Sequence, residues 1–535
     1  MAEIDKTAHL LMKRFGSLES QRATWESHWQ EIGDYVVTRK ADITKKRSPG
    51  DKNTELMFDT TAPLAAELLS ASLHGMLTNM STKWFSLNFR DRELNGNDEA
   101  REWLGSVEEV MYQAFARSNF AEQIHELYHD LITFGTGVLF IERDDDFQIR
   151  FSARHISECY VSEDDNGRVD TVFRKFKMPA RAVVNKFGVA NVSQKILKRE
   201  QENPYEMVTL IHAVFKRDER DITKIDAGNK PVASVYLDPE AKAVLSESGF
   251  DEFPYCVPRF LKSSYEVGYG RSPSMVALPD IKMINVMSQV TIRAAQKQVD
   301  PPLLVPDDGF VLPVRTVPGG LNFYRSGTRD RIEPLNIGAN NVLGLNMEEQ
   351  RRKAIQAAFY VDQLLLGQGP QMTATEVVQR TEEKMRMLGP VLGRLQFELL
   401  QPLITRTYNL LSRQKAFEAA PEFMRESDIE IEYVSPLAKA QRQGDVQSMM
   451  RFLEMLSPFA QIDPGVLDFL DVDGMAKEMI KVLSIPATVV KGDEEVAEVR
   501  EQRQAQQQKQ AEQQEMMQTA EAAGNAAPMI KAVQQ

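Results

Sequence analysis

The sequence predicts a chain of the α+β class, in which helical and strand-rich stretches follow one another. Three observations support this prediction. Apolar residues recur at helical spacing in much of the first 131 residues, strand-type segments with acidic turns follow between residues 136 and 178, and helix-start and helix-stop signals flank a proline-rich segment at residues 301–334. We therefore expect helices and hairpin-linked strands in one mixed chain.

Composition is that of an ordinary globular protein, and its 535 residues are enough for more than one domain. The net charge is -13 and the pI is about 5.3. Tight DNA binding needs many phosphates neutralised by Lys and Arg, so an acidic chain without a finger, zipper or RNA-binding motif is expected to hold DNA only loosely.

No membrane span or secretion signal is expected. The longest strongly apolar run, Leu131–Ile141, is interrupted by Gly135 and Gly137 and is shorter than a bilayer span. The N-terminus lacks the apolar core of a signal peptide. Cys159 and Cys256 belong to no metal-ligand spacing, so each is expected to be a small buried hydrophobe in a reducing compartment.

The first half of the chain is expected to begin with helices and continue with strands. Apolar spacing predicts a first helix whose buried side carries Trp25 and Trp29. The acidic turns "DDD" and "DDNG" separate the later strands. The predicted helices are Glu19–Val37, Thr61–Met80, Glu99–Arg117 and Phe120–Leu131, and the predicted strands lie in "TKWFSLNF", residues 136–178, "PYEMVTLIHAVFKR" and "PVASVYLD".

Two further helices flank the proline-rich segment. Ser272 and Pro273 form a helix-start pair, and Asp300 with the prolines after it ends this first helix. Within the insertion, "FVLPVRTV" and "GLNFYR" are strand-like. Asn346 and Glu349 form a capping-box pattern that predicts the start of the second helix, which ends at the glycines of "LLLGQGPQM".

A long helix follows, with Thr373 and Glu376 as its capping box. Its pattern continues to about residue 414, and Pro390 and Pro402 should each bend it. "DIEIEYVSP" is a predicted strand that returns to the β-rich part. Shorter helices are expected in Ala438–Leu483, and a Gln-rich helix that frays into a tail is expected in Lys491–Gln535.

One motif points to catalysis. His125, Glu126 and His129 have the H-E-x-x-H spacing with which zinc peptidases bind their metal. Candidate third ligands lie only in strand or loop stretches, and Asp130 stands where such enzymes carry an uncharged residue. We therefore expect a structural helix with these three side chains nearer the solvent and a buried stripe of Ile124, Leu127 and Leu131.

The remaining motifs favour structure over chemistry. "GYGRS" lacks the third glycine of a dinucleotide loop and the Lys-Ser/Thr pair of a phosphate loop, so it is expected to be a turn into a helix. Asp144, Asp145 and Asp146 sit at a predicted hairpin tip, where solvation explains them. No catalytic constellation remains, and neither a cofactor nor a metal is expected.

Three stretches of the middle and end of the chain are distinctive: "SYEVGYGRSPSMVALPDIKMINVM", "QMTATEVVQRTEEKMRMLGPVLGRLQFELLQPLITR" and the Gln-rich end. On these stretches the chain resembles the portal, or head-to-tail connector, proteins of short-tailed bacteriophages, and the resemblance is densest from Tyr265 to Arg406. It implies a portal fold with a wing, a helical stem, a small β-rich clip and a helical crown and barrel. The implied parts are residues 1–271 (wing), 272–299 (first stem helix), 300–345 (clip), 346–366 (second stem helix), 367–372 (tunnel loop), 373–436 (long kinked helix and wing return strand), 437–490 (crown) and 491–535 (barrel helix or tail).

The resemblance also implies a function without enzymatic activity. The protein would form a ring, generally of twelve subunits, at one capsid vertex of the virion after assembly in the host cytoplasm. Double-stranded DNA would pass through it without sequence specificity, and its partners would be the terminase packaging ATPase, a tail adaptor, and the major capsid and scaffold proteins. The implied DNA-channel residues are Lys282, Arg293, Lys297, Gly367, Gln368, Gly369, Pro370, Gln371 and Met372, and the implied clip residues for partner binding are Arg315, Arg325, Arg329 and Arg331.

Alternatives remain at this point. The three channel cations could instead pair with Glu348 and Glu349 of a neighbouring subunit. The chain could be a zinc-dependent hydrolase that uses the HELYH motif, which metal analysis would reveal. It could also be another structural virion protein, such as a tail adaptor or a scaffold, and rings in electron microscopy would distinguish a portal from these.

Overall fold

The computed structural model of the chain divides into two units. One unit comprises Met1–Ser81 and Ala114–Leu410, and the other comprises Thr82–Gln113 and Leu411–Gln535. The described residues are 2–305 (except 46, 49, 53, 92–93, 95–96, 147, 222 and 225), 313, 323, 333–334, 342–364, 387–424, 429–433, 449–456, 471, 473–476, 479 and 495–509.

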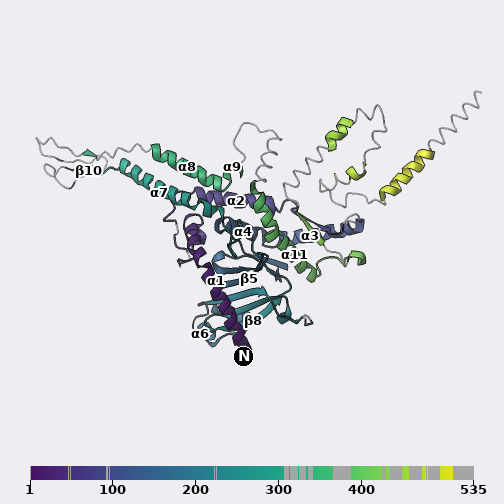
Figure 1. Ribbon diagram of the computed structural model, residues 1–535, viewed down its shortest axis with the longest axis horizontal. Coiled ribbons are helices and arrows are strands. Elements are labelled where there is room, and N and C mark those ends of the chain that lie inside the picture. The colour runs from purple at the N-terminus through teal and green to yellow at the C-terminus, as the bar shows by residue number, and fades with distance from the viewer. Residues whose placement is uncertain are drawn as a thin grey trace, which may run out of the picture. The chain divides into compact units, whose positions relative to one another are not determined.

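A five-stranded antiparallel sheet forms one part of the first unit (Figure 1). Its strands follow chain order, so each pairs with the strand before it, and the connection between the second and third strands contains two short helices. The acidic turn "DDNG" joins the first two of them, as predicted, and Gly167 takes a positive φ of 74° there. The strands are β4 (Cys159–Glu163), β5 (Val169–Pro179), β6 (Met207–Lys216), β7 (Val232–Asp238) and β8 (Ala243–Phe250).

Helices cover both faces of this sheet. Side chains alternate along a strand, so the neighbours Leu210 and Ile211 of β6 enter different apolar clusters. Ile211 packs with residues of helix α1 (Ala2–Tyr35), whereas Leu210 packs with residues of the two short helices that interrupt the sheet, α5 (Ala180–Phe187) and α6 (Gln194–Glu202). The sheet is thus the middle layer of this part of the molecule.

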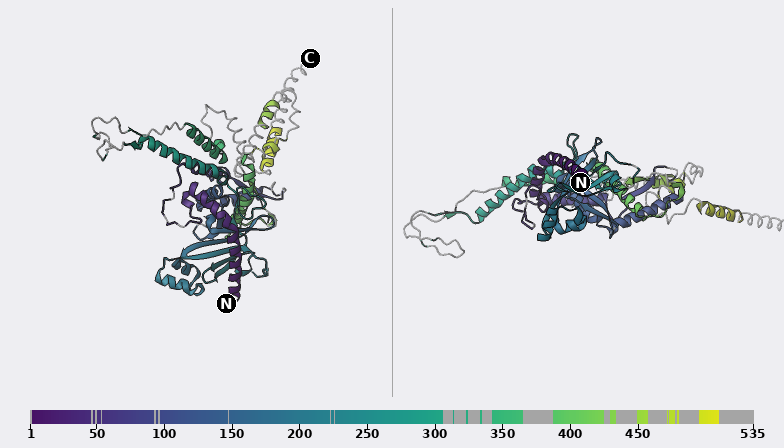
Figure 2. Two further views of the ribbon diagram at one scale, coloured as in Figure 1. Left: turned by 60° about the vertical axis from the view of Figure 1, so that its left-hand side comes forward. Right: turned by 90° about the horizontal axis from the view of Figure 1, so that it is seen from below.

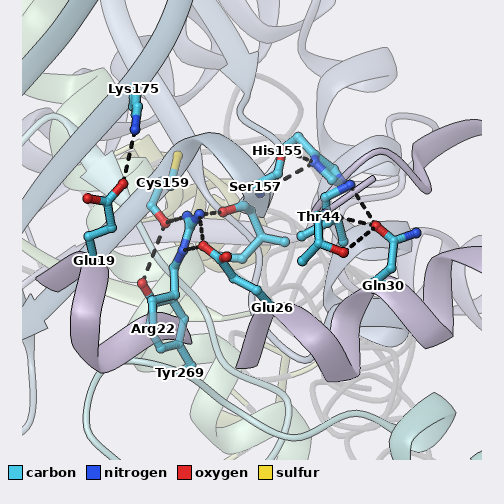
Figure 3. Close-up of polar contacts among 12 residues, drawn as sticks. Glu19, Arg22, Glu26, Gln30, Thr44, His155, Ser157, Cys159, Lys175 and Tyr269 are labelled. Atoms are coloured by element: carbon cyan, nitrogen blue, oxygen red, sulfur yellow. Dashed lines mark hydrogen bonds and ion pairs between the residues drawn. The ribbon is translucent and has the colours of Figure 1, made fainter. Parts of the chain in front are cut away.

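Helix α1 begins far earlier than predicted. It starts at Ala2 rather than at Glu19, because Ala8, Leu11 and Phe15 recur at helical spacing and bury themselves on the sheet. Further along, Arg22 is 3% exposed and donates hydrogen bonds from its guanidinium to the carbonyls of Ile156 and Cys159 (Figure 3). These contacts attach the middle of the helix to the start of β4.

A second, three-stranded sheet lies beside helix α4 (Phe120–Phe134). The order of its strands is β3-β2-β9, and the predicted acidic turn joins β2 to β3. Helix α2 (Thr61–Leu77) packs on α4. Both helices were predicted within a few residues of their observed ends. The strands are β2 (Leu139–Asp144), β3 (Gln148–Ala153) and β9 (Tyr255–Cys256).

Two backbone segments meet closely where α4 ends. Gly135 has a φ of 82°, and a Cβ atom placed on it would lie 2.2 Å from the carbonyl oxygen of Gly270. Only glycine tolerates both the conformation and the approach. "GYGRS" is therefore a turn into a helix, as predicted, and the reason for its second glycine is this contact. The two cysteines are buried as predicted, and burial raises the pKa of both thiols to about 12.

Helix α7 (Pro273–Val299) and helix α8 (Val342–Ala358) run side by side away from the five-stranded sheet (Figures 1 and 2). The predicted start of α7 is confirmed, because the Ser272 hydroxyl accepts a hydrogen bond from the Met275 N–H at 3.1 Å. The predicted start of α8 is wrong. This helix begins at Val342, so Asn346 is already inside it and caps nothing.

The second helix also ends earlier than its predicted limit at residue 366. Tyr360 takes a positive φ of 59° after α8, and a separate short helix, α9 (Val361–Leu364), follows. A non-glycine residue in this conformation interrupts the helical hydrogen bonding. Between α7 and α8, Leu303–Leu304 (β10) pairs antiparallel with Glu333–Pro334 (β11), so the insertion leaves and returns through adjacent strands.

The long helix is described from residue 387 to residue 413. It is helical over 387–395, widens into a π-helical turn at Gln396–Leu400 and continues as α11 (Gln401–Arg413). Pro402 has no N–H to donate to the preceding turn. Just before it, the Gln401 N–H bonds to the carbonyl of Gln396, five residues back, which is the hydrogen bond of a π-helix. The irregularity expected near this proline is therefore a wide turn that immediately precedes it.

In the second unit, the strand predicted in "DIEIEYVSP" is confirmed, but it forms a separate two-stranded sheet and does not return to the β-rich part of the first unit. Strand β1 (Phe85–Phe89) pairs antiparallel with β12 (Ile429–Tyr433). Most of helix α3 (Asp98–Arg117) belongs to this unit, and its Tyr112 hydroxyl accepts hydrogen bonds from the N–H groups of Trp84 and Phe85. Helix α3 therefore holds the start of the two-stranded sheet.

Several predictions lie outside the described residues. These are the strands "FVLPVRTV" and "GLNFYR", the capping box of Thr373 and Glu376, and most of the helices expected in residues 438–483. Residues 495–509 of the Gln-rich end are helical, as predicted. Among the described residues, no helix combines the length and apolarity that a bilayer crossing requires.

Candidate assembly and channel surface on helix α7

Helices α7 and α8 are joined by a buried polar contact. Glu348 of α8 is only 4% exposed. One of its carboxylate oxygens accepts a hydrogen bond from the Thr291 hydroxyl of α7 at 2.6 Å, and the other pairs with the Arg352 guanidinium at 3.2 Å. A buried carboxylate needs such partners to offset its desolvation, so this contact holds the two helices in one relative position.

The same helix pair is attached to the start of α2. Arg352 also donates a hydrogen bond to the carboxylate of Asp59 at 3.0 Å, and the Asn285 side-chain oxygen of α7 accepts from the N–H groups of Phe58 and Asp59. Burial alone would raise the pKa of Asp59, but hydrogen bonds from Thr61 and Arg352 outweigh it and lower that pKa. Asp59 is therefore a carboxylate that links α8 to α2.

These contacts exclude one of the partners considered for the channel cations. Glu348 is buried and paired within its own chain, so it is not available to a neighbouring subunit. Glu349 is exposed and lies 3.6 Å from Lys353 of the same helix. This exposed pair contributes little to stability, and Glu349 keeps the freedom to change partner.

Helix α7 has an apolar stripe on the side that faces away from its buried residues. The buried side carries Ile281, Ile284 and Ser288. On the outer side, apolar residues recur at intervals of seven, three and four residues, which places them on one helical face. The members of this outer stripe are Val276, Met283, Val286 and Val290, with exposed fractions of 65, 46, 58 and 57%.

The outer stripe was not predicted from the sequence, although the spacing of its residues is a usable signal. The alternation of apolar and polar residues in α7 did not show which apolar residues would be buried, because Ile281 and Ile284 have the same helical spacing as the exposed ones. Unpartnered apolar faces of this kind mark interaction surfaces in soluble proteins.

The three predicted channel cations of α7 differ in their surroundings. Lys282 pairs with Glu31 of α1 at 3.2 Å, so it belongs to an ion pair within the chain. Arg293 and Lys297 follow Val290 at intervals of three and four residues and so continue the face of the outer stripe. Both are exposed, and neither makes an ion pair with any other described residue. The face is thus apolar near the body and basic toward the insertion.

The other predicted site residues lie outside the described part of the chain. These are the proposed tunnel loop and the four arginines of the insertion: Gly367, Gln368, Gly369, Pro370, Gln371, Met372, Arg315, Arg325, Arg329 and Arg331.

The HELYH motif is a structural element of the contact between α2 and α4. The Nε2 atoms of His125 and His129 lie 3.2 and 3.5 Å from the two carboxylate oxygens of Glu67. Contrary to expectation, His129 is not near the solvent, since only 5% of it is exposed. Within the described residues, no group of three or more His, Cys, Asp or Glu side chains is arranged to hold a metal ion.

Glu126 is also unsuited to the role of a water-activating base. Its carboxylate lies 2.9 Å from Arg39 and 2.7 Å from Lys40. Burial alone would raise the pKa of Glu126, but hydrogen bonds and charges from Lys40 and Arg39 lower it to about 2. A base with such a pKa binds a proton only weakly at neutral pH. The motif therefore serves packing and ion pairing.

Known proteins resemble this chain over most of its length. A family model described as a bacteriophage head to tail connecting protein matches residues 8–490. A probable portal protein of Bordetella phage BPP-1 is 33% identical over 506 residues, which cover 92% of this chain and 90% of that protein. The portal protein of Salmonella phage epsilon15 is 31% identical over 513 residues, which cover 94% and 92%.

Two solved structures with detectable similarity come from gene transfer agent (GTA) particles. A chain from the neck of an empty GTA particle is 12% identical, with a TM-score of 0.37 over 76% of this chain and 93% of that chain. A chain from the virion of a native GTA particle is 12% identical, with a TM-score of 0.31 over 71% and 94%.

Proposed function

Because the chain belongs to the family of bacteriophage head-to-tail connecting proteins, we propose that it forms a ring at one vertex of the capsid, generally of twelve copies. Double-stranded DNA is packaged, retained and ejected through this ring, which also joins the head to the tail. The protein is a structural component of the virion, assembled in the host cytoplasm, and the energy for packaging comes from a separate ATPase.

The observation that carries this proposal is the outer stripe of α7. The stripe belongs to a helix pair that is fixed to the body of the first unit through Glu348, Arg352 and Asp59. A rigid helix with an exposed apolar face is suited to side-by-side packing with a copy of itself. Around a ring, each α7 then buries its stripe against the next subunit.

The basic end of α7 suits the passage of DNA. Each fixed phosphate contact strengthens binding, and it also hinders sliding. The chain has a net charge of -13 and offers on this face two cations, Arg293 and Lys297, that form no ion pair with other described residues; it meets the duplex through few and weak contacts. We assign these two residues to the channel, whereas Lys282 is engaged with Glu31.

We assign the remaining parts by analogy with the family. The insertion after α7 is the clip, whose Arg315, Arg325, Arg329 and Arg331 contact the terminase and then the tail adaptor. Residues 367–372 form the tunnel loop, and the wing, crown and barrel occupy residues 1–271 with 373–436, 437–490 and 491–535. Contacts with the major capsid and scaffold proteins follow from the position at the vertex.

Electron microscopy of the purified protein tests the ring. Replacing both Val286 and Val290 by Asp should abolish rings while circular dichroism shows an intact fold, since each buried valine contributes about 1.5–3 kcal/mol. Val189→Asp is the matched control, because Val189 is 63% exposed on a different part of the same unit. Normal rings from the double variant would exclude the outer stripe as the interface. A wild-type protein that never forms rings would overturn the proposed function.

DNA packaging tests the tunnel loop separately. Deletion of residues 367–372 should leave rings intact but reduce the amount of nuclease-protected DNA in assembled particles. Wild-type packaging by the deletion variant would refute the assignment of this loop.

A further inference from the structure

Arg154 carries a positive charge that no carboxylate of the described chain pairs with. It directly follows strand β3, and its main-chain N–H donates a hydrogen bond to the carbonyl of Val138 at 2.7 Å, which fixes its backbone. The side chain is only partly exposed, and its guanidinium carbon lies 5.8 Å from the centroid of the Phe140 ring. Its Nε is buried without a partner, and the side chain forms no hydrogen bond or ion pair with any other described residue. A charge in this position loses hydration without a compensating contact.

The groups around Arg154 leave its charge unmatched. Glu142 attracts the guanidinium, but the two side chains form no ion pair. Cys159 and Tyr255 are also close, yet burial raises the pKa of both, to about 12 for the thiol, so both are neutral at pH 7. Burial lowers the pKa of Arg154 itself, and the charge of Arg174 lowers it further, as expected for a cation that lacks a partner.

Two further cations lie near Arg154, on one face of the five-stranded sheet. Arg174, His212 and Tyr236 are neighbours in register across strands β5, β6 and β7. The Phe140 ring of β2 lies over this row, with its centroid 6.0 Å from that of His212. Besides burial, three positive charges lower the pKa of His212, so all three lie close to the row. They belong to Lys186, Arg174 and Arg154. The two sheets therefore bring three cations together.

The charges of this cluster do not cancel. Arg174 is engaged, since its Nε donates a hydrogen bond to Glu158 at 2.8 Å. Lys186 is exposed, donates a hydrogen bond to the Tyr236 hydroxyl at 3.2 Å and forms no ion pair with another described residue. Three cations thus face two carboxylates, those of Glu158 and Glu142, which leaves one positive charge in excess. One added carboxylate balances the cluster, whereas a phosphate group with a charge of about -2 exceeds what is needed.

We propose that the cluster of Arg154, Arg174 and Lys186 binds an acidic segment of another protein, with one carboxylate of that segment on the Arg154 guanidinium. A guanidinium meets a carboxylate through two parallel hydrogen bonds, and partial burial beside aromatic rings strengthens such a pair. The chain as a whole has a net charge of -13 and repels acidic partners elsewhere, so a local basic cluster determines where such a partner binds. The proposal goes beyond the ring and does not depend on it, because every contact that supports it lies within one chain.

Fluorescence anisotropy of a labelled hexaglutamate peptide on the full-length protein tests the proposal. The wild type should bind hexaglutamate but not hexaglutamine, and Arg154→Met should weaken binding by about tenfold, because it removes one charge-assisted pair. Arg150→Met is the matched control, since Arg150 lies four residues earlier on β3 and its charge is offset by Asp144 at 3.6 Å. Without peptide, Arg154→Met should unfold at the same temperature as the wild type or higher, because methionine keeps the aliphatic stem and removes an unpaired charge.

The opposite results would overturn the proposal. A wild type that does not bind hexaglutamate has no such site. Unchanged affinity in Arg154→Met, or an equal loss in Arg150→Met, would show that Arg154 is not the binding group. A clearly lower unfolding midpoint of Arg154→Met would make its guanidinium a structural group instead. Inorganic phosphate that displaces the peptide as well as free glutamate does, or better, would assign the cluster to phosphate rather than to a carboxylate.

Discussion

Glu398 accepts hydrogen bonds from both the main-chain N–H and the guanidinium of Arg259, at 2.9, 3.1 and 2.7 Å. Arg259 is 2% exposed and also lies 3.1 Å from Glu163 of β4. Glu398 belongs to the π-helical turn that precedes Pro402. The wide turn therefore places a carboxylate where it joins the long helix to the five-stranded sheet through one buried arginine.

Weakening this pair should destabilise the first unit. Glu398→Gln keeps the shape of the side chain but removes its charge, so among the described residues the guanidinium retains Glu163 alone as a charged partner. Hydrogen bonds to charged groups contribute about 1.5–3 kcal/mol each, and we expect a loss of stability in this range. Thermal unfolding of the variant measures it. Glu349→Gln is the matched control in an exposed pair and should change the midpoint little; equal midpoints for both variants would contradict the prediction.

The contact between Gly135 and Gly270 should tolerate no side chain. In Gly135→Ala, the new methyl group would have to occupy space within 2.2 Å of a main-chain oxygen, in a backbone conformation with φ of 82°. The left-handed conformation alone costs about 1–2 kcal/mol, and the collision adds to it. We expect mostly insoluble protein or a strongly lowered unfolding midpoint.

Gly16→Ala provides the comparison for this experiment. Gly16 lies within α1, and a Cβ atom there would meet nothing within 4 Å. Replacing glycine by alanine inside a helix should stabilise it by about 0.5–1 kcal/mol. If Gly135→Ala were as soluble and stable as Gly16→Ala, the close approach of the two backbone segments would be wrong.

Sequence patterns located those elements whose signals are local. The Ser272–Pro273 pair identified the start of α7, and hydrophobic spacing identified α2 and α4. The capping pattern of Asn346 and Glu349 gave a wrong start for α8, because these residue types also occur inside helices. The helix begins four residues earlier, at Val342. The first part of α1 was missed although Leu11 and Phe15 share a helical spacing; what the sequence does not show is the sheet on which they are buried.

The candidate site was harder to predict because its partners are remote in sequence. Lys282 was expected in the channel, but its counter-ion Glu31 is separated from it by most of the first unit's sequence. The pairing of Glu348 within its own chain depends on Arg352, which lies four residues further along the same helix, and on Thr291, which is remote in sequence and which no local pattern reveals. The spacing of apolar residues sorts them onto two faces of α7. Only the packing of the helix against the rest of the chain shows which of the two faces is buried.

Purified protein should contain far less than one zinc ion per chain. His125 and His129 direct their Nε2 atoms at Glu67, and Glu126 is held by Arg39 and Lys40. A chelator should therefore leave the unfolding temperature unchanged. Elemental analysis after dialysis against zinc checks the first expectation. Stoichiometric zinc that disappears in His125→Ala would contradict it and revive the hydrolase interpretation.

His212 should make the first unit less stable in mild acid. This imidazole is 3% exposed and bonds to the Ser234 hydroxyl at 2.9 Å. Burial lowers its pKa to about 3, and the positive charges of Lys186, Arg174 and Arg154 act in the same direction. The unfolded chain, with an ordinary histidine pKa of about 6.5, therefore binds a proton at a pH where the folded chain does not.

The sign of this effect follows from proton binding. The contribution of His212 to stability is fully present above pH 6.5 and is lost as the pH falls from about 6.5 towards 3, by about 1.4 kcal/mol per pH unit once well below 6.5. His212→Gln removes the titrating group, so its unfolding midpoint should fall less steeply between pH 6.5 and 4 than that of the wild type. His9→Gln changes an exposed histidine of α1 and should leave the slope unaltered. Thermal unfolding of the three proteins across this pH range gives the unfolding midpoint as a function of pH. If the midpoints of His212→Gln and the wild type fell equally steeply, the buried imidazole would not be the group that links stability to pH.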